Sequence, residues 1–69
     1  MNKQGRKQLE EAMEMLRNAE LIATTIKEEE EEKYENMPES FQLQEIIDTL
    51  DSCIISIEEA YTSLEEVLC

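Results

Sequence analysis

Residues 43–69 read LQEIIDT, LDSCIIS, IEEAYTS and LEEVLC when they are written in sevens, and this repeat decides the fold. Apolar side chains fill three of its columns. These are the a column (Leu43, Leu50, Ile57, Leu64), the d column (Ile46, Cys53, Ala60, Val67) and the e column (Ile47, Ile54, Tyr61, Leu68). Only an α-helix places three such columns on one side. Because a two-stranded coiled coil needs only a and d, the wider stripe predicts a helix with more than one neighbour.

A second helical pattern precedes the repeat. Its apolar residues recur three and four apart at Leu9, Ala12, Leu16, Ala19, Ala23 and Ile26, and Met13, Met15 and Ile22 widen the stripe. A break follows at Pro38, which suits the first position of a helix and not its interior. We expect helices over about residues 6–36 and 38–68, joined by a turn at 37–38, in one domain spanning 1–69. Glu39 is then in the first turn of the second helix, and Phe41 closes the end of the core.

So short a connection makes the two helices antiparallel neighbours. If the chain folds back about residue 38, facing residues have numbers that sum to about 76, and the first stripe meets the a and d columns. Large side chains then face small ones, as Leu16 faces Ala60 and Ala19 faces Ile57, which favours close packing. Cys53 becomes a small buried side chain. The predicted fold class is all-α, an antiparallel helical hairpin.

Apolar residues remain uncovered when a and d close the hairpin. Burying one large apolar side chain is worth ~1.5–3 kcal/mol, so leaving seven exposed forfeits on the order of 10 kcal/mol. A second copy of the hairpin is the simplest cover. The sequence therefore predicts a homodimeric four-helix bundle or a higher homo-oligomer, self-associating through Met13, Met15, Ile22, Ile47, Ile54, Tyr61 and Leu68.

The charge balance restricts the partners. The formal net charge is -12, and all six basic residues precede Pro38, whereas eight acidic residues and no basic ones follow it. Such a chain is a poor ligand for nucleic acid or an anionic membrane, and it favours a partner protein with a basic surface. The candidate partner-binding residues are Leu21 and Ile55, which lie off the stripe, and the acids Glu45, Asp48, Asp51, Glu58, Glu59, Glu65 and Glu66. The alternative is that these side chains only keep the helices solvated.

The sequence offers little chemistry. The absence of His excludes a histidine base and the Glu-x-x-His ligands of di-iron bundles. Neighbouring glutamates on a helix point about 100 degrees apart, so they do not converge. There is no Gly-rich phosphate loop and no calcium-binding loop. We therefore expect no enzymatic activity, no catalytic residue, no metal and no cofactor.

Localisation is inferred from the cysteines and from hydropathy. Cys53 and Cys69 are far apart and lack metal-site spacing, which fits reduced thiols in a cytosol. The sequence has no apolar signal region at its start and no run near the ~20 residues that a membrane span requires. A soluble cytoplasmic protein is expected.

The turn carries a resemblance to a known set of proteins. It reads NMPESFQ over residues 36–42, between helices of the types LEEAMEMLRNAE and IEEAYTSLEEVL. This resembles short two-helix proteins of phages and prophages of Gram-positive bacteria, in which an NLPESLQ-like turn joins two Glu-rich helices. The resemblance covers most of the chain and implies a hairpin of phage type in a bacterial host. It implies no site, but small phage proteins often bind and disable host proteins, defence systems included.

Three functional hypotheses result. The first is a non-enzymatic interaction protein that binds and modulates a host or phage protein, including as an inhibitor of a defence system. The second is a nucleic-acid mimic whose acidic helix occupies the basic cleft of a protein that handles DNA or RNA. The third is a small-molecule sponge with a ligand between subunits, which the scarcity of inward polar groups disfavours.

Overall fold

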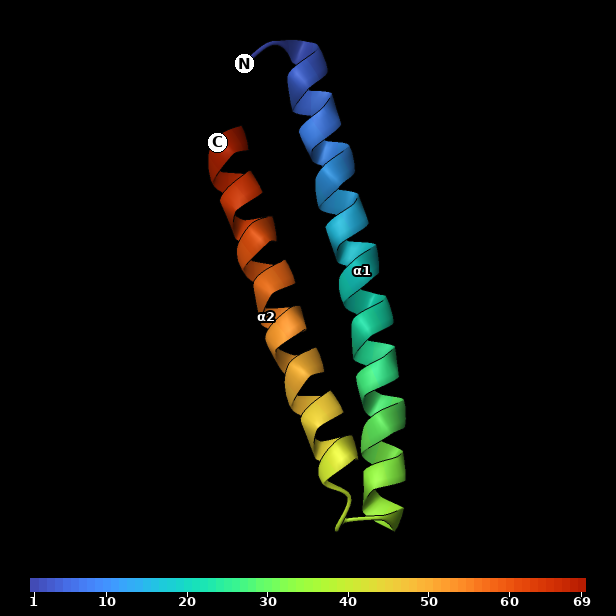
Figure 1. Cartoon of the computed structure of the whole chain (residues 1–69). Helices are drawn as coiled ribbons and strands as arrows, with labels where there is room; N and C mark the ends of the chain where they lie inside the picture. Colours follow the sequence, from blue (N-terminus) through green and yellow to red (C-terminus); the bar gives the residue numbers. More distant parts are fainter.

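The fold is a hairpin of two long helices. A computed structural model describes residues 1–69 and contains α1, spanning Lys3–Asn36, and α2, spanning Phe41–Leu68. The helices run antiparallel and side by side, with both termini at the end opposite the connection (Figure 1). The molecule measures 53 by 14 by 13 Å. The predicted all-α helical hairpin is confirmed.

The first helix begins at a capping residue earlier in the chain than predicted. The Asn2 side-chain oxygen accepts a hydrogen bond from the Gly5 N–H at 2.7 Å. Asn is a preferred residue at this position because it satisfies a backbone donor that the helix leaves free. As a result α1 begins at Lys3 rather than near residue 6.

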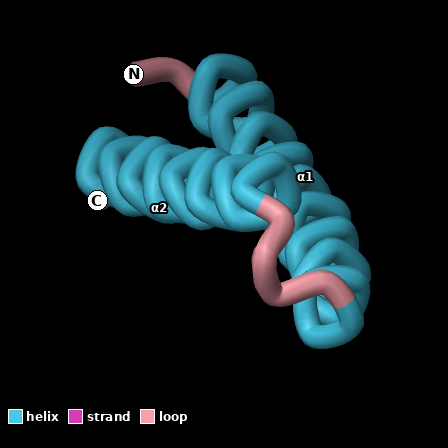
Figure 2. The backbone as a smooth tube through the Cα atoms, turned by 60° about the horizontal axis from the view of Figure 1, so that its bottom comes forward, coloured by secondary structure: helices cyan, strands magenta, loops and turns pink.

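The connection is longer than the sequence predicted, and Figure 2 shows it crossing from α1 to α2. Residues 37–40 form a β-turn in which the Ser40 N–H donates to the Met37 carbonyl at 3.0 Å. Pro38 occupies the second position of that turn, which its fixed φ favours. The Ser40 hydroxyl accepts from the Leu43 N–H at 3.2 Å and caps α2, which Pro38 cannot do. Helix α2 therefore begins at Phe41 and not at Pro38.

Two expectations near the turn are therefore wrong. Glu39 lies in the β-turn and not in the first turn of α2. The Phe41 side chain does not close the core, because it is 84% exposed. Both errors follow from placing the helix start three residues too early.

The two helices meet along a seam of half-buried residues. Its members on α1 are Leu9, Met13, Leu16, Glu20, Ala23, Lys27, Glu30 and Tyr34. Its members on α2 are Leu43, Ile47, Leu50, Ile54, Ile57, Tyr61, Leu64 and Leu68. Both sets alternate between spacings of four and three, which keeps them on one side of a helix. Ala23 is the one residue of the chain that is buried, at 8% exposed.

The predicted division of the α2 stripe is wrong. The a and e columns form the seam, whereas the d column, with Ile46, Cys53, Ala60 and Val67, is exposed. The reason is size: every residue in the a and e columns is large, and the d column includes Cys53 and Ala60. Turning α2 toward a and e covers more apolar surface. Cys53 is consequently an exposed thiol and not a buried one.

The predicted face of α1 is partly wrong: Leu9, Leu16 and Ala23 lie in the seam as predicted, but other members of the stripe do not. Ala19 and Ile26 are exposed, and Glu20 and Lys27 occupy the seam positions next to them. The register is also shifted, because Arg17 contacts Tyr61 and Lys27 pairs with Asp51, so that facing residues sum to 78 and not 76. A turn that occupies residues 37–40 rather than 37–38 moves the fold-back point by about one residue, which accounts for this shift.

Candidate functional site

The seam divides the surface of the hairpin into two faces. Neighbouring residues on an α-helix are about 100 degrees apart, so residues just before seam positions lie on one side and residues just after them on the other. In an antiparallel pair of right-handed helices, the residues before the seam on both helices share one side. Each face is therefore built from both α1 and α2.

The uncharged face consists of the residues that precede seam positions. Its members are Ala12, Met15, Ala19, Ile22 and Ile26 on α1, and Ile46, Thr49, Cys53, Ser56, Ala60, Ser63 and Val67 on α2. Met15 and Ile22 are 68% and 62% exposed. Charges on this side begin only at Glu29 and Lys33, toward the turn.

The acidic face consists of the residues that follow seam positions. Its members are Glu10, Glu14, Arg17, Leu21, Thr24, Glu28, Glu31 and Glu35 on α1, and Gln44, Asp48, Asp51, Ile55, Glu58, Thr62 and Glu65 on α2, with Cys69 directly after its end. Nine of the 18 acidic residues are on this face, against a single basic residue, Arg17. Leu21 and Ile55 are exposed among those acids, at 66% and 56%.

A pair of side chains from both helices marks the middle of the acidic face. The Arg17 Nε donates a hydrogen bond to the Tyr61 hydroxyl at 3.1 Å. The guanidinium also lies over the Tyr61 ring, 4.8 Å from its centroid, which is a favourable cation–π distance. The hydrogen bond to Tyr61 raises the pKa of Arg17 above its ordinary value, and the carboxylates of Glu20 and Glu65 contribute in the same direction. Arg17 is a fixed positive charge within an acidic surface.

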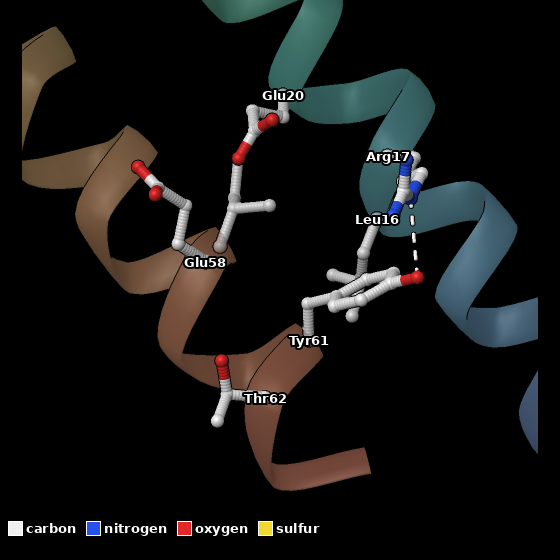
Figure 3. A pocket seen from close by; sticks show the side chains of 7 residues that line it. Leu16, Arg17, Glu20, Glu58, Tyr61 and Thr62 are labelled. Carbon is white, nitrogen blue, oxygen red and sulfur yellow. Dashed lines mark hydrogen bonds between the residues drawn. The ribbon is translucent and has the colours of Figure 1, made fainter. Parts of the chain in front are cut away.

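A shallow pocket of about 240 Å³ opens beside this pair. It is lined by Leu16, Arg17, Glu20, Ile57, Glu58, Tyr61 and Thr62. Figure 3 shows Arg17 hydrogen-bonded to Tyr61, with the carboxylates of Glu20 and Glu58 farther along the pocket. The lining thus combines the carboxylates of Glu20 and Glu58 with the apolar side chains of Leu16 and Ile57.

One ion pair joins the helices on the same face. The Lys27 ammonium, whose side chain is 25% exposed in the seam, pairs with the Asp51 carboxylate. The hydrogen bond to Asp51 raises the pKa of Lys27 above its ordinary value. At the far end, the Arg6 guanidinium donates to the Leu68 carbonyl at 2.6 Å, which satisfies a carbonyl in the last turn of α2. Both contacts help to fix the register.

The predicted site residues divide between these surfaces. Of the residues predicted to self-associate, only Met15 and Ile22 are on the uncharged face. Met13 and the e column (Ile47, Ile54, Tyr61, Leu68) are in the seam. The predicted partner-binding residues Leu21, Ile55, Asp48, Asp51, Glu58 and Glu65 come together on the acidic face. The remaining acids Glu45, Glu59 and Glu66 are exposed on the outer side of α2.

Sequence reasoning missed Arg17, Glu20 and the role of Tyr61. Arg17 is the lone base between Lys7 and Lys27, which is a weak signal in a chain with 18 acids. Its contact with Tyr61 spans 44 positions and depends on the register. A predicted register in which the numbers of facing residues sum to 78 would have placed Arg17 opposite Tyr61.

Comparisons with known proteins give no relative. No family model, no curated protein and no solved structure matches the chain. The structure also shows no group of three or more acidic or cysteine side chains placed to hold a metal ion. Neither α1 nor α2 contains an apolar segment of the length that a membrane span requires.

Proposed function

We propose that this chain is a non-enzymatic interaction protein that forms a homodimeric four-helix bundle and binds a protein with a basic surface through its acidic face. The observation that carries the proposal is the concentration of nine acids on one side, with two exposed aliphatic side chains among them. Leu21 and Ile55 add apolar area that a partner could cover.

The phage-like turn suggests the class of target. A host or phage protein whose activity is changed by the bound hairpin, defence proteins included, fits a small acidic protein without chemistry of its own. Electrostatic attraction between the acidic face and a basic partner favours rapid association that weakens as salt is added. The expected setting is the cytoplasm of the bacterial host.

Dimerisation is supported by the smallness of the core. Only Ala23 is buried in the single hairpin, although the chain is 41% apolar. Domains of this size are near the limit at which one chain buries enough apolar surface to be stable. Sedimentation at micromolar concentration is expected to give a dimer, and a folded monomer would contradict this part of the proposal.

Partner binding is tested by affinity capture from a lysate of a Gram-positive host. The wild-type bait is compared with a bait carrying Asp48→Lys and Glu58→Lys on the acidic face. The matched control bait carries Glu59→Lys and Glu66→Lys, which change the charge equally on the outer side of α2. Wild type and control are expected to recover the same protein in stoichiometric amount, and the acidic-face bait to lose it. Equal recovery by all three baits, or none by wild type, contradicts the proposal.

The nucleic-acid mimic is the second candidate, and the acidic face supports it too. The two candidates differ in how they use Leu21 and Ile55. If the chain is a mimic that fills a basic cleft by charge alone, its affinity for the partner is unchanged by Leu21→Ala and by Ile55→Ala. If the partner instead covers Leu21 and Ile55, as the first candidate requires, both variants bind it more weakly. The salt dependence of binding then stays the same.

A further inference from the structure

The hairpin has one face that nothing in the single chain covers. Met15, Ile22 and Ile26 on α1 are 68%, 62% and 41% exposed, and Ile46 and Val67 on α2 are 42% and 52% exposed. They belong to the uncharged face, which extends over residues 12–26 of α1 and residues 46–67 of α2. Several large apolar side chains exposed on one uncharged face are typical of an interaction site.

The absence of charge on this face is its most informative property. The chain carries 18 acidic residues, yet none lies on the uncharged face between Met15 and Ile26 or between Ile46 and Val67. A partner attracted by the net charge of -12 would bind the acidic face instead. A second copy of this chain carries the same -12, so it can approach closely only where neither copy presents carboxylates.

Side-chain sizes on the uncharged face fit a second copy. Helix α1 presents the large Met15, Ile22 and Ile26 together with the small Ala19, and α2 presents only small residues over the same stretch. Facing residues within the hairpin sum to 78, so Met15 is level with Ser63 and Ile22 with Ser56. A two-fold axis parallel to the helices places α1 of one copy against α2 of the other. Because this rotation does not move residues along the axis, the residues that are level within one hairpin are also level between the two copies. Large side chains then meet small ones on both sides of the axis, which close packing requires.

We infer that the uncharged face is the self-association surface, with α1 of one copy packed antiparallel on α2 of a second copy. This rests on the homodimer proposed above and replaces the e column as its interface. Each copy contributes the same residues, and the acidic faces point away from each other. The bundle then presents two acidic faces to partners.

The test compares two neighbouring residues in the full chain by sedimentation at micromolar concentration. Ile22→Glu puts a carboxylate at the centre of the uncharged face, and Leu21→Glu puts the same carboxylate on the acidic face. The two side chains are similarly exposed, at 62% and 66%, so each is the control for the other. Ile22→Glu is expected to weaken dimerisation on the order of a hundredfold or more, and Leu21→Glu to leave a dimer. Ile22→Ser and Leu21→Ser repeat the comparison without added charge.

The outcomes separate this inference from the proposed function. A dimeric wild type with an equally dimeric Ile22→Glu overturns the interface and leaves the homodimer standing. Equal loss of dimer in both glutamate variants and in both serine variants also overturns the interface. A monomeric wild type refutes the homodimer and the interface together, while partner capture is judged separately.

The relative orientation is tested by mixing variants. Ser56→Lys alone is expected to weaken the dimer, because it places a lysine against Ile22 of the second copy. Mixed with Ile22→Glu, it is expected to form a heterodimer in which the introduced glutamate of one copy meets the introduced lysine of the other. Native mass spectrometry distinguishes the heterodimer, and recovery of helical circular dichroism on mixing shows that the variants fold. Failure to form heterodimer overturns the packing of α1 on α2.

Discussion

At the scale of single residues, the polar members of the seam fix which residues of the helices face each other. Apolar seam residues can slide by one helical turn and still pack. The contact of Arg17 with Tyr61 and the ion pair of Lys27 with Asp51 each require one register. Exposed pairs of this kind contribute little stability. Their contribution is specificity, because a shifted register separates both pairs at once.

The Lys27–Asp51 pair predicts a change in stability at alkaline pH. Asp51 raises the pKa of Lys27 above 10.5 in the folded chain, so the folded state binds a proton more tightly than the unfolded state. The stabilisation is fully present below the unfolded pKa and is lost as pH rises through the folded pKa. Asp51→Asn is expected to lower the melting temperature near neutral pH, and the difference from wild type is expected to shrink as pH rises through the folded pKa of Lys27.

Circular dichroism melting curves at several pH values check this prediction. Asp48→Asn is the matched control, because Asp48 is exposed on the same face and forms no ion pair. If the melting temperature of Asp51→Asn stays below that of wild type by the same amount up to the highest pH, the result argues against the ion pair.

At the scale of the elements, the caps determine where each helix begins. Asn2 and Ser40 each accept a backbone hydrogen bond from the first turn of the helix that follows. Ser40 also donates its own N–H to Met37 across the β-turn. One residue thus ends the turn and starts α2, so the length of the connection and the phase of α2 depend on it.

Removing this cap is expected to destabilise the hairpin. Ser40→Ala leaves the Leu43 N–H without its partner, which costs about 1 kcal/mol in comparable caps. Thermal or urea unfolding measures the loss. Ser52→Ala is the control, since Ser52 is exposed within α2 and alanine is a better helix former. Equal effects of the two substitutions would show that the Ser40 cap contributes nothing.

At the scale of the whole molecule, like-charge repulsion opposes the fold. The 18 acids and six bases form only two ion pairs, Lys27 with Asp51 and Lys33 with Glu30. Five consecutive glutamates, residues 28–32, lie on α1, and the neighbouring α2 carries acidic residues but no basic ones. Repulsion therefore exceeds attraction, and screening should stabilise the hairpin and any assembly of it.

Salt is accordingly expected to raise the melting temperature. The measurement is thermal unfolding between about 0.05 M and about 0.5 M sodium chloride, a range over which the Debye length falls several-fold. A variant with Glu29→Gln and Glu32→Gln should melt higher than wild type at low salt and gain less from added salt. A melting temperature that falls with salt would mean that the two ion pairs outweigh the repulsion.

The sequence by itself determined two helices, an antiparallel hairpin and the residues from which any seam must be chosen. Helical periodicity and a short turn suffice for that, because both act locally. Only the tertiary structure decided that the a and e columns face α1 and that Ile46, Cys53 and Val67 stay outside. Both choices satisfy the heptad spacing, and they differ in a rotation of α2 about its own axis. That rotation depends on the summed packing of all seam side chains and on the turn of residues 37–40, neither of which is a local property. The uncharged face exists only as a result of it.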